Sequence, residues 1–213
     1  ATCASAWLAD ACQALHPGLV FSHMEDFKIL KGITFDDGLN EYTLELKPVS
    51  TSGEDRKVYD ALVTSPNGGN RRIFHYSGQV TLSQQVPPAP RSASLAALNK
   101  YDLQPKDGKE FYSNGTLFHG PSFQGIQEVL LVNEKQVVIK VLLPPLGAQV
   151  QGQFPARVTN PFINDAIVQS LLIWTQAFYD APCLPSRLHQ WEHYRLIPFG
   201  VPVWAFLEVT QAN

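Results

Sequence analysis

A carboxyl group and an amide lie four residues apart in one apolar stretch of this sequence. Asp165 and Gln169 belong to NPFINDAIVQSLLIWTQAF, residues 160–178. Residues four apart are neighbours on one face of an α-helix, so the two groups would meet. A carboxyl group enclosed by apolar side chains favours its protonated form, which a general acid needs near neutral pH. A structural interpretation also fits: Asp165 complements the helix dipole near the N-terminus, and Gln169 is its hydrogen-bonding neighbour.

A second group of polar candidates lies in GTLFHGPSFQGI, residues 115–126. Gly120 followed by Pro121 predicts a turn, with a phenylalanine on each side to anchor it. The turn would present the polar groups of His119 and Gln124. A plain corner between two strands explains the same residues, so a functional interpretation requires this turn and the helix to meet.

The stretch from residue 160 to residue 178 predicts a buried helix that would position Asp165. Asn160 can cap its start, and Pro161 occupies the first helical position, where the missing N–H is no loss. Apolar side chains occupy almost every side of the helix. We therefore expect strands to surround it.

The elements follow a pattern that occurs twice along the chain. Residues 1–15 carry an apolar helical stripe, and the alternating stretches that follow favour antiparallel strands. Residues 84–99 are rich in Pro, Ala and Ser, which is typical of a semi-rigid connector. Stretches 109–132 and 135–144 are strand-like, the long helix follows, and strands are predicted again near residues 187–197 and 201–209. We predict an α+β protein with a first half at 1–83, a linker at 84–99 and a second half at 100–213.

Composition excludes several classes of function. The chain has 213 residues, 45% of them hydrophobic, and a formal net charge of -3. That charge gives no footprint for nucleic acid, and no apolar run approaches the ~18 residues of a membrane span. Three cysteines without metal-ligand spacing favour a reduced, cytoplasmic setting for a soluble protein. His189 and His193 lack a third ligand, so no metal is expected, and no serine has the spacing of a nucleophile elbow.

Three motifs in order, HGPSFQG, NDAIVQ and CLPSRL, resemble the dehydratase domains of modular polyketide synthases and polyunsaturated fatty acid synthases. The similarity runs from about residue 115 to residue 209, while the first half is similar mainly in layout. The resemblance implies a double hotdog, in which each half is a sheet wrapped around a long helix. His119 stands where polyketide dehydratases often carry Tyr, which favours the polyunsaturated fatty acid synthase branch.

The resemblance also implies a chemistry, the elimination of water from a 3-hydroxyacyl thioester. Asp165 would be the acid that assists departure of the hydroxyl, and Gln169 would orient it. The substrate would travel on the phosphopantetheine arm of an acyl carrier protein, so neither metal nor nicotinamide is needed. An acyl tunnel is expected between the helix and the HGPSFQG loop. The expected substrate-binding residues are His119, Gly120, Pro121, Phe123 and Gln124.

The base of this family is a histidine in a His-x-x-x-Gly-x-x-x-x-Pro motif before the first hotdog helix. None of the six histidines here has that spacing, so no residue is assigned as the base. We expect the chain to be trimmed at both ends, with the motif upstream and further strands downstream. If the parent protein also lacks the histidine, the domain is a pseudo-dehydratase. A third possibility is that His119 has taken the role of the base.

Two other functions fit the same architecture. One is a noncatalytic scaffold that holds carrier proteins or neighbouring synthase domains. The other is a cyclase similar to product-template domains. Arg157, Arg187 and Arg195 are candidates for contact with an acidic carrier protein. A double hotdog satisfies its pairing internally, so a monomeric fold unit is expected.

Overall fold

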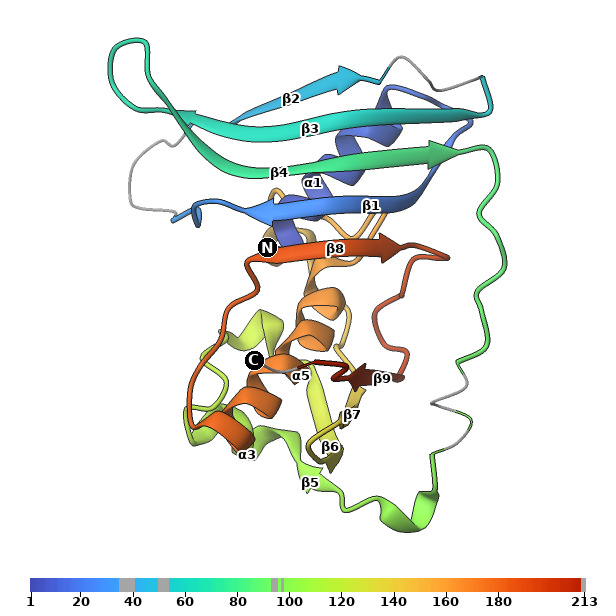
Figure 1. Cartoon of the computed structure of the whole chain (residues 1–213), viewed down its shortest axis with the longest axis vertical. Helices are drawn as coiled ribbons and strands as arrows, with labels where there is room; N and C mark the ends of the chain where they lie inside the picture. The colour runs from blue at the N-terminus through green and yellow to red at the C-terminus, as the bar shows by residue number, and fades with distance from the viewer. Residues whose placement is uncertain (35–40, 50–53, 93–95, 97, 212–213) are drawn as a thin grey trace. The chain divides into compact units, whose positions relative to one another are not determined.

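Strand-forming and helix-forming stretches alternate along the chain, and the structure gathers them into two units (Figure 1). It is a computed structural model that describes residues 1–34, 41–49, 54–92, 96 and 98–211. Unit 1 contains Ala1–Ala89, Arg157–Thr159 and Pro185–Leu196, and unit 2 contains Pro90–Ala156, Asn160–Leu184 and Ile197–Asn213. Each unit is an antiparallel sheet with a helix packed on it.

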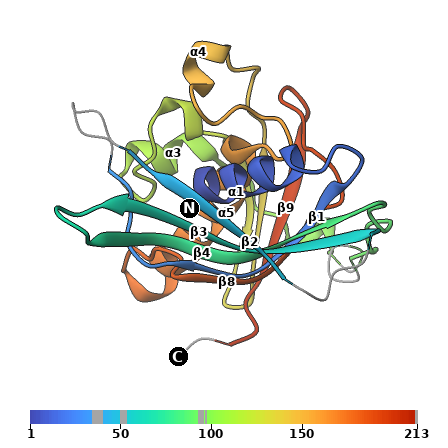
Figure 2. The same cartoon turned by 90° about the horizontal axis from the view of Figure 1, so that it is seen from above.

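Unit 1 is built on a five-stranded antiparallel sheet with the order β2-β3-β4-β1-β8. Its elements are α1 (Thr2–Ala14), β1 (Val20–Ile29), β2 (Thr43–Pro48), β3 (Arg56–Pro66), β4 (Arg72–Ser83) and β8 (Arg187–Glu192). Helix α1 lies against one face of the sheet (Figure 2). Its Leu8, Ala9 and Cys12 are fully buried, and they share a core with Val63 and Val80 of the strands. The predicted apolar stripe of residues 1–15 therefore faces this sheet.

Unit 2 is built on a four-stranded antiparallel sheet with the order β5-β6-β7-β9. Its strands are β5 (Lys106–Asp107), β6 (Ile126–Val132), β7 (Gln136–Val141) and β9 (Val203–Glu208). Its helices are η1 (Lys100–Asp102), α3 (Gly108–Ser113), η2 (Pro121–Phe123), α4 (Ala148–Gln151) and α5 (Pro161–Tyr179). Helix α5 packs mainly on β7 and β6, so its apolar side chains form the core of the unit.

Helix α5 begins as its sequence predicts. The side chain of Asn160 accepts a hydrogen bond from the Ile163 N–H at 3.3 Å, and its amide donates to the Ile197 oxygen at 3.1 Å. Pro161 is the first helical residue, where no N–H is needed. Near the other end, the Trp174 Nε1–H donates to the Glu134 oxygen at 3.2 Å. These bonds tie both ends of the helix to the rest of unit 2.

Two segments differ from the expectations drawn from sequence. Residues 108–113 form helix α3, although the stretch from residue 109 looked strand-like; the side chain of Asp107 caps this helix by accepting from the Lys109 N–H at 2.9 Å. Strand β8 pairs with β1 of unit 1, although residues 187–192 were expected in the second half. A sequence pattern can identify a strand, but the partner of that strand is set by contacts far along the chain.

Among the described residues, no helix is both long enough and apolar enough to cross a membrane.

Candidate active site

Asp165 and Gln169 meet on α5 in unit 2. The Gln169 Nε2–H donates to Asp165 Oδ2 at 3.0 Å. The Asp165 side chain keeps 19% of its accessible surface, while Gln169 keeps 1%. The carboxyl group is therefore sheltered yet still reachable by a ligand, and the amide beneath it is sealed in the core.

The amide of Gln169 is held at both of its ends. Its nitrogen also donates to the Phe123 oxygen at 2.9 Å. Its oxygen accepts from the Tyr112 hydroxyl at 2.8 Å. A buried amide that satisfies its groups in this way has one stable orientation, with its N–H groups directed at Asp165 and at the loop.

The loop at residues 115–126 meets α5 because of a close approach at Gly125. A Cβ placed on Gly125 would lie 3.0 Å from the Ala166 Cβ and 3.0 Å from the Leu143 Cγ. Next to it, the rings of Phe123 and Phe162 pack with their centroids 5.0 Å apart. The absence of a side chain at residue 125 therefore lets the loop rest directly on the helix that carries Asp165.

His119 extends from this loop to the carboxyl group. Its Nε2 lies 3.4 Å from Asp165 Oδ2, and 16% of its side chain is exposed. The imidazole stacks on Phe118 with centroids 4.4 Å apart. The Gln124 Nε2–H donates to the His119 oxygen at 2.9 Å and so fixes the backbone of the loop. The predicted turn and the predicted helix thus come together within unit 2.

Burial lowers the pKa of His119 below its ordinary value of 6.5, and the nearby Asp165 carboxylate opposes that shift only in part. Its Nδ1 is buried and has no hydrogen-bond partner. A proton on Nδ1 would be a buried donor without an acceptor, which is costly. These facts favour a neutral imidazole whose proton sits on Nε2, directed at Asp165.

Tyr112 of α3 completes the cluster, and sequence reasoning missed it. The Ile126 N–H donates to its hydroxyl oxygen at 3.2 Å. Burial raises the pKa of Tyr112 to about 12, so the hydroxyl keeps its proton. The only signal in the sequence was Asp107 three residues before Glu110, which is typical of a helix start. That signal could have placed Tyr112 on a helix but not beside Gln169.

The structure leaves the other predicted binding residues in supporting positions. Gly120 precedes the short helix η2, and Pro121 begins it; both are exposed. Phe123 contributes its backbone oxygen to Gln169, and its ring is partly buried in the core. Their contact with substrate, and the acyl tunnel, stay predictions.

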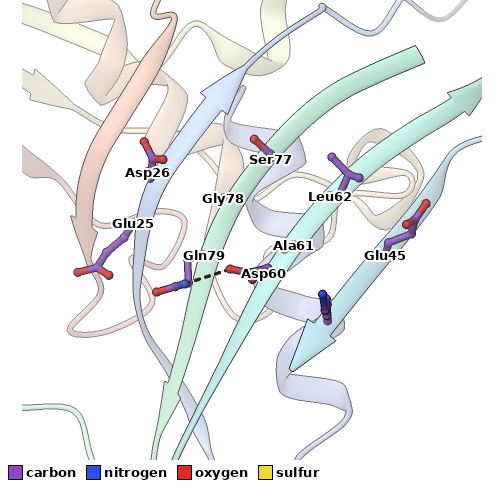
Figure 3. Close-up of a pocket in the computed structure, with 10 residues that line it drawn as sticks. Glu25, Asp26, Glu45, Asp60, Ala61, Leu62, Ser77, Gly78 and Gln79 are labelled. Carbon is purple, nitrogen blue, oxygen red and sulfur yellow. Dashed lines mark hydrogen bonds between the residues drawn. The ribbon is translucent and has the colours of Figure 1, made fainter. Parts of the chain in front are cut away.

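The largest cavity of the described structure lies elsewhere, in unit 1. It measures about 480 Å³ and is lined only by residues of β1 to β4 (Figure 3). Its acidic residues are Glu25, Asp26, Glu45 and Asp60. Most of them have partners: Lys28 lies 2.9 Å from Asp26, Arg72 pairs with Glu45, and Gln79 donates to Asp60 at 3.0 Å. Among the described residues no cluster of three or more His, Cys, Asp or Glu side chains can hold a metal ion.

Comparison with known proteins gives one family and several relatives. The family model described as the polyketide synthase dehydratase N-terminal domain matches residues 90–213. One relative, from Thraustochytrium sp. (strain ATCC 26185 / S-3), is a large subunit of a polyunsaturated fatty acid synthase and is 28% identical over 209 residues. The match covers 97% of this chain and 7% of that protein, so the chain spans a small part of its relative.

Solved structures share the fold. The dehydratase domain from the CurF module of curacin polyketide synthase superposes with a TM-score of 0.68 at 18% identity, over 96% of this chain and 71% of that one. The dehydratase domain of RzxB from Pseudomonas fluorescens gives 0.65 at 16% identity, over 97% of this chain and 70% of that one. At such identities the likeness concerns the fold alone.

Proposed function

Because this chain belongs to the polyketide synthase dehydratase family, we propose that it eliminates water from a 3-hydroxyacyl thioester. The substrate would be carried on the phosphopantetheine arm of an acyl carrier protein, in polyunsaturated fatty acid or polyketide synthesis. The relative among polyunsaturated fatty acid synthases supports the first of these two settings.

The elimination breaks two bonds and forms one double bond. A base takes the proton from the α-carbon, and the electrons of that C–H bond form the double bond to the β-carbon. The C–O bond at the β-carbon breaks, and the protonated Asp165 gives its proton to the departing hydroxyl, which leaves as water. The Asp165 carboxylate that remains is stabilised by the hydrogen bond from Gln169.

The observation that carries this proposal is the bond from the Gln169 amide to Asp165 Oδ2 at 3.0 Å, beneath a carboxyl group that is 19% exposed. A hydrogen bond to a developing charge strengthens as that charge grows, so it favours the transition state over the bound substrate. The amide is already fixed by Tyr112 and Phe123. Little reorganisation is then needed when the proton leaves.

We assign His119 to the loop side of the site, where it would hold the substrate beside Asp165. Its Nε2 faces the carboxyl group at 3.4 Å, which suits a partner of the acid better than a base aimed at an α-carbon. The expected base belongs to the His-x-x-x-Gly-x-x-x-x-Pro motif, and no histidine of this sequence has that spacing.

We also propose that the two units are the two halves of a double hotdog. Each consists of an antiparallel sheet with an apolar helix on one face, α1 in unit 1 and α5 in unit 2. The similarity to dehydratase domains over almost the whole chain supports this assignment.

The test is to offer a 3-hydroxyacyl carrier-protein thioester to the full natural polypeptide that contains these residues. We expect an enoyl thioester, detected by mass spectrometry as the loss of one water. Asp165→Asn should lower the rate about a hundred- to ten-thousand-fold while the variant still binds substrate. Asp180→Asn at the C-terminal end of α5 is the matched control, because the side chain of Asp180 accepts from Gln176 within its own helix turn, and it should keep the rate of the parent.

The rival proposal is a noncatalytic scaffold, and it rests on the absence of the base motif from this sequence. It predicts no enoyl product from the parent, with carrier-protein binding that is equal in the parent and in Asp165→Asn. A cyclised product in place of the enoyl thioester would instead favour a cyclase.

A further inference from the structure

The hydroxyl of Tyr112 has its bonds assigned by its neighbours. The Ile126 N–H is a donor, so at 3.2 Å the Tyr112 oxygen must accept from it. The hydroxyl has one proton, and the Gln169 oxygen lies 2.8 Å away. Tyr112 therefore donates to Gln169, and β6 fixes the direction in which it does so.

The amide of Gln169 is thereby held from two elements at once. Tyr112 of α3 holds its oxygen, while the Phe123 oxygen, which can only accept, holds its nitrogen at 2.9 Å. The remaining N–H of the amide is directed at Asp165 Oδ2. If the oxygen lost its donor, the side chain would keep a buried unsatisfied acceptor and would gain freedom to rotate away from Asp165.

We propose that Tyr112 is a positioning residue for the elimination: its hydroxyl holds the Gln169 amide in the one orientation that supports Asp165. This inference rests on the proposed function for its catalytic consequence. Its structural part, the control of Gln169 by Tyr112, stands on the contacts within unit 2. Tyr112 does not touch the reacting atoms in this scheme and acts only through Gln169.

The first test measures the amide itself. In the parent protein the side-chain N–H₂ of Gln169 should exchange slowly with solvent, because both hydrogens are bonded and the residue is 1% exposed. In Tyr112→Phe we expect at least about tenfold faster exchange by NMR. Tyr101→Phe, at a residue that is 84% exposed, should leave that exchange unchanged. Equal exchange in Tyr112→Phe and the parent would overturn the inference, whether or not the protein turns over substrate.

The second test asks whether Tyr112 acts through Gln169 in turnover. Tyr112→Phe should lower kcat roughly tenfold with little change in KM. In a Gln169→Ala background the same substitution should have no further effect, because the group it positions is gone. An equal loss of kcat in both backgrounds would show that Tyr112 acts independently, and it would overturn the proposed route.

A pH profile separates positioning from simple damage to the fold. His119 from the loop and Tyr112 from α3 face Asp165. A looser Gln169 gives the Asp165 carboxylate a weaker hydrogen bond, so the acid should keep its proton to higher pH. The alkaline limb of kcat in Tyr112→Phe should therefore move upward, whereas a merely damaged fold lowers kcat at every pH alike. Ionisation of Tyr112 does not enter, since burial raises its pKa to about 12.

These outcomes keep the two proposals distinguishable. Absence of turnover in the parent, together with faster Gln169 exchange in Tyr112→Phe, would reject the proposed function and retain Tyr112 as the residue that holds the amide. Turnover in the parent with unchanged Gln169 exchange would do the reverse.

Discussion

Gly125→Ala tests whether the loop that carries His119 rests on α5 as closely as the structure indicates. The new Cβ would lie 3.0 Å from the Ala166 Cβ, 3.0 Å from the Leu143 Cγ and 3.2 Å from the Leu143 Cδ1. These distances are shorter than ordinary carbon–carbon contacts of about 3.5–4.0 Å. The Leu143 side chain can turn aside, but the Ala166 Cβ is fixed to the helix backbone. The loop must therefore move by a few tenths of an ångström.

We expect this overpacking to lower the free energy of unfolding by about 1–3 kcal/mol. Urea denaturation followed by tryptophan fluorescence should show a lower midpoint with an unchanged slope, which indicates lost stability rather than a changed denatured state. The loop should also shift relative to Asp165, so kcat should fall more than the residual stability alone explains.

Gly120→Ala is the matched control in the same loop. Gly120 has a φ of -69°, which alanine adopts without strain, and nothing lies within 4 Å of the position that its Cβ would take. This variant should unfold within about 0.5 kcal/mol of the parent or be slightly more stable. If Gly125→Ala were as stable as Gly120→Ala, the close contact between loop and helix would be refuted, and the placement of His119 beside Asp165 with it.

Two further predictions concern the elements that hold the site. Asn160→Ala removes the cap of α5 and the bond to the Ile197 oxygen, so the free energy of unfolding should fall by about 2 kcal/mol; Asn160→Ser, which keeps a capping oxygen, should recover part of it in the same urea titration. The second is a pH dependence. Burial lowers the pKa of His119 below 6.5 in the folded state, so the unfolded chain binds a proton more readily and stability should fall as pH drops below 6.5 towards the folded-state pKa. His119→Gln should show a smaller loss than the parent between pH 7.5 and pH 5.5, and an equal loss would contradict the neutral imidazole.

The family was accessible from the sequence because its signal is local. The motifs HGPSFQG and NDAIVQ are short and contiguous, and the match over residues 90–213 confirms the resemblance that they predicted. Helix α5 was equally local. Its cap at Asn160, its start at Pro161 and its apolar faces are all written within 19 helical residues and the one before them.

The neighbours of the site were not accessible in the same way. Tyr112 lies 57 positions before Gln169, and no spacing rule relates two residues so far apart. Helix α3 was taken for a strand because its six residues are too few to show a helical period. The pairing of β8 with β1 also joins residues far apart in sequence.

The sequence by itself determined that Asp165 and Gln169 share one face of a buried helix, because a helix repeats every 3.6 residues and neighbours on it are set by spacing alone. Only the tertiary structure decided what meets that face. His119 reaches Asp165 because Gly125 lets its loop rest on α5, and Tyr112 reaches Gln169 because α3 packs beside β6. Such contacts depend on how closely separate elements pack, and packing is a property of the whole fold rather than of any one stretch of the chain.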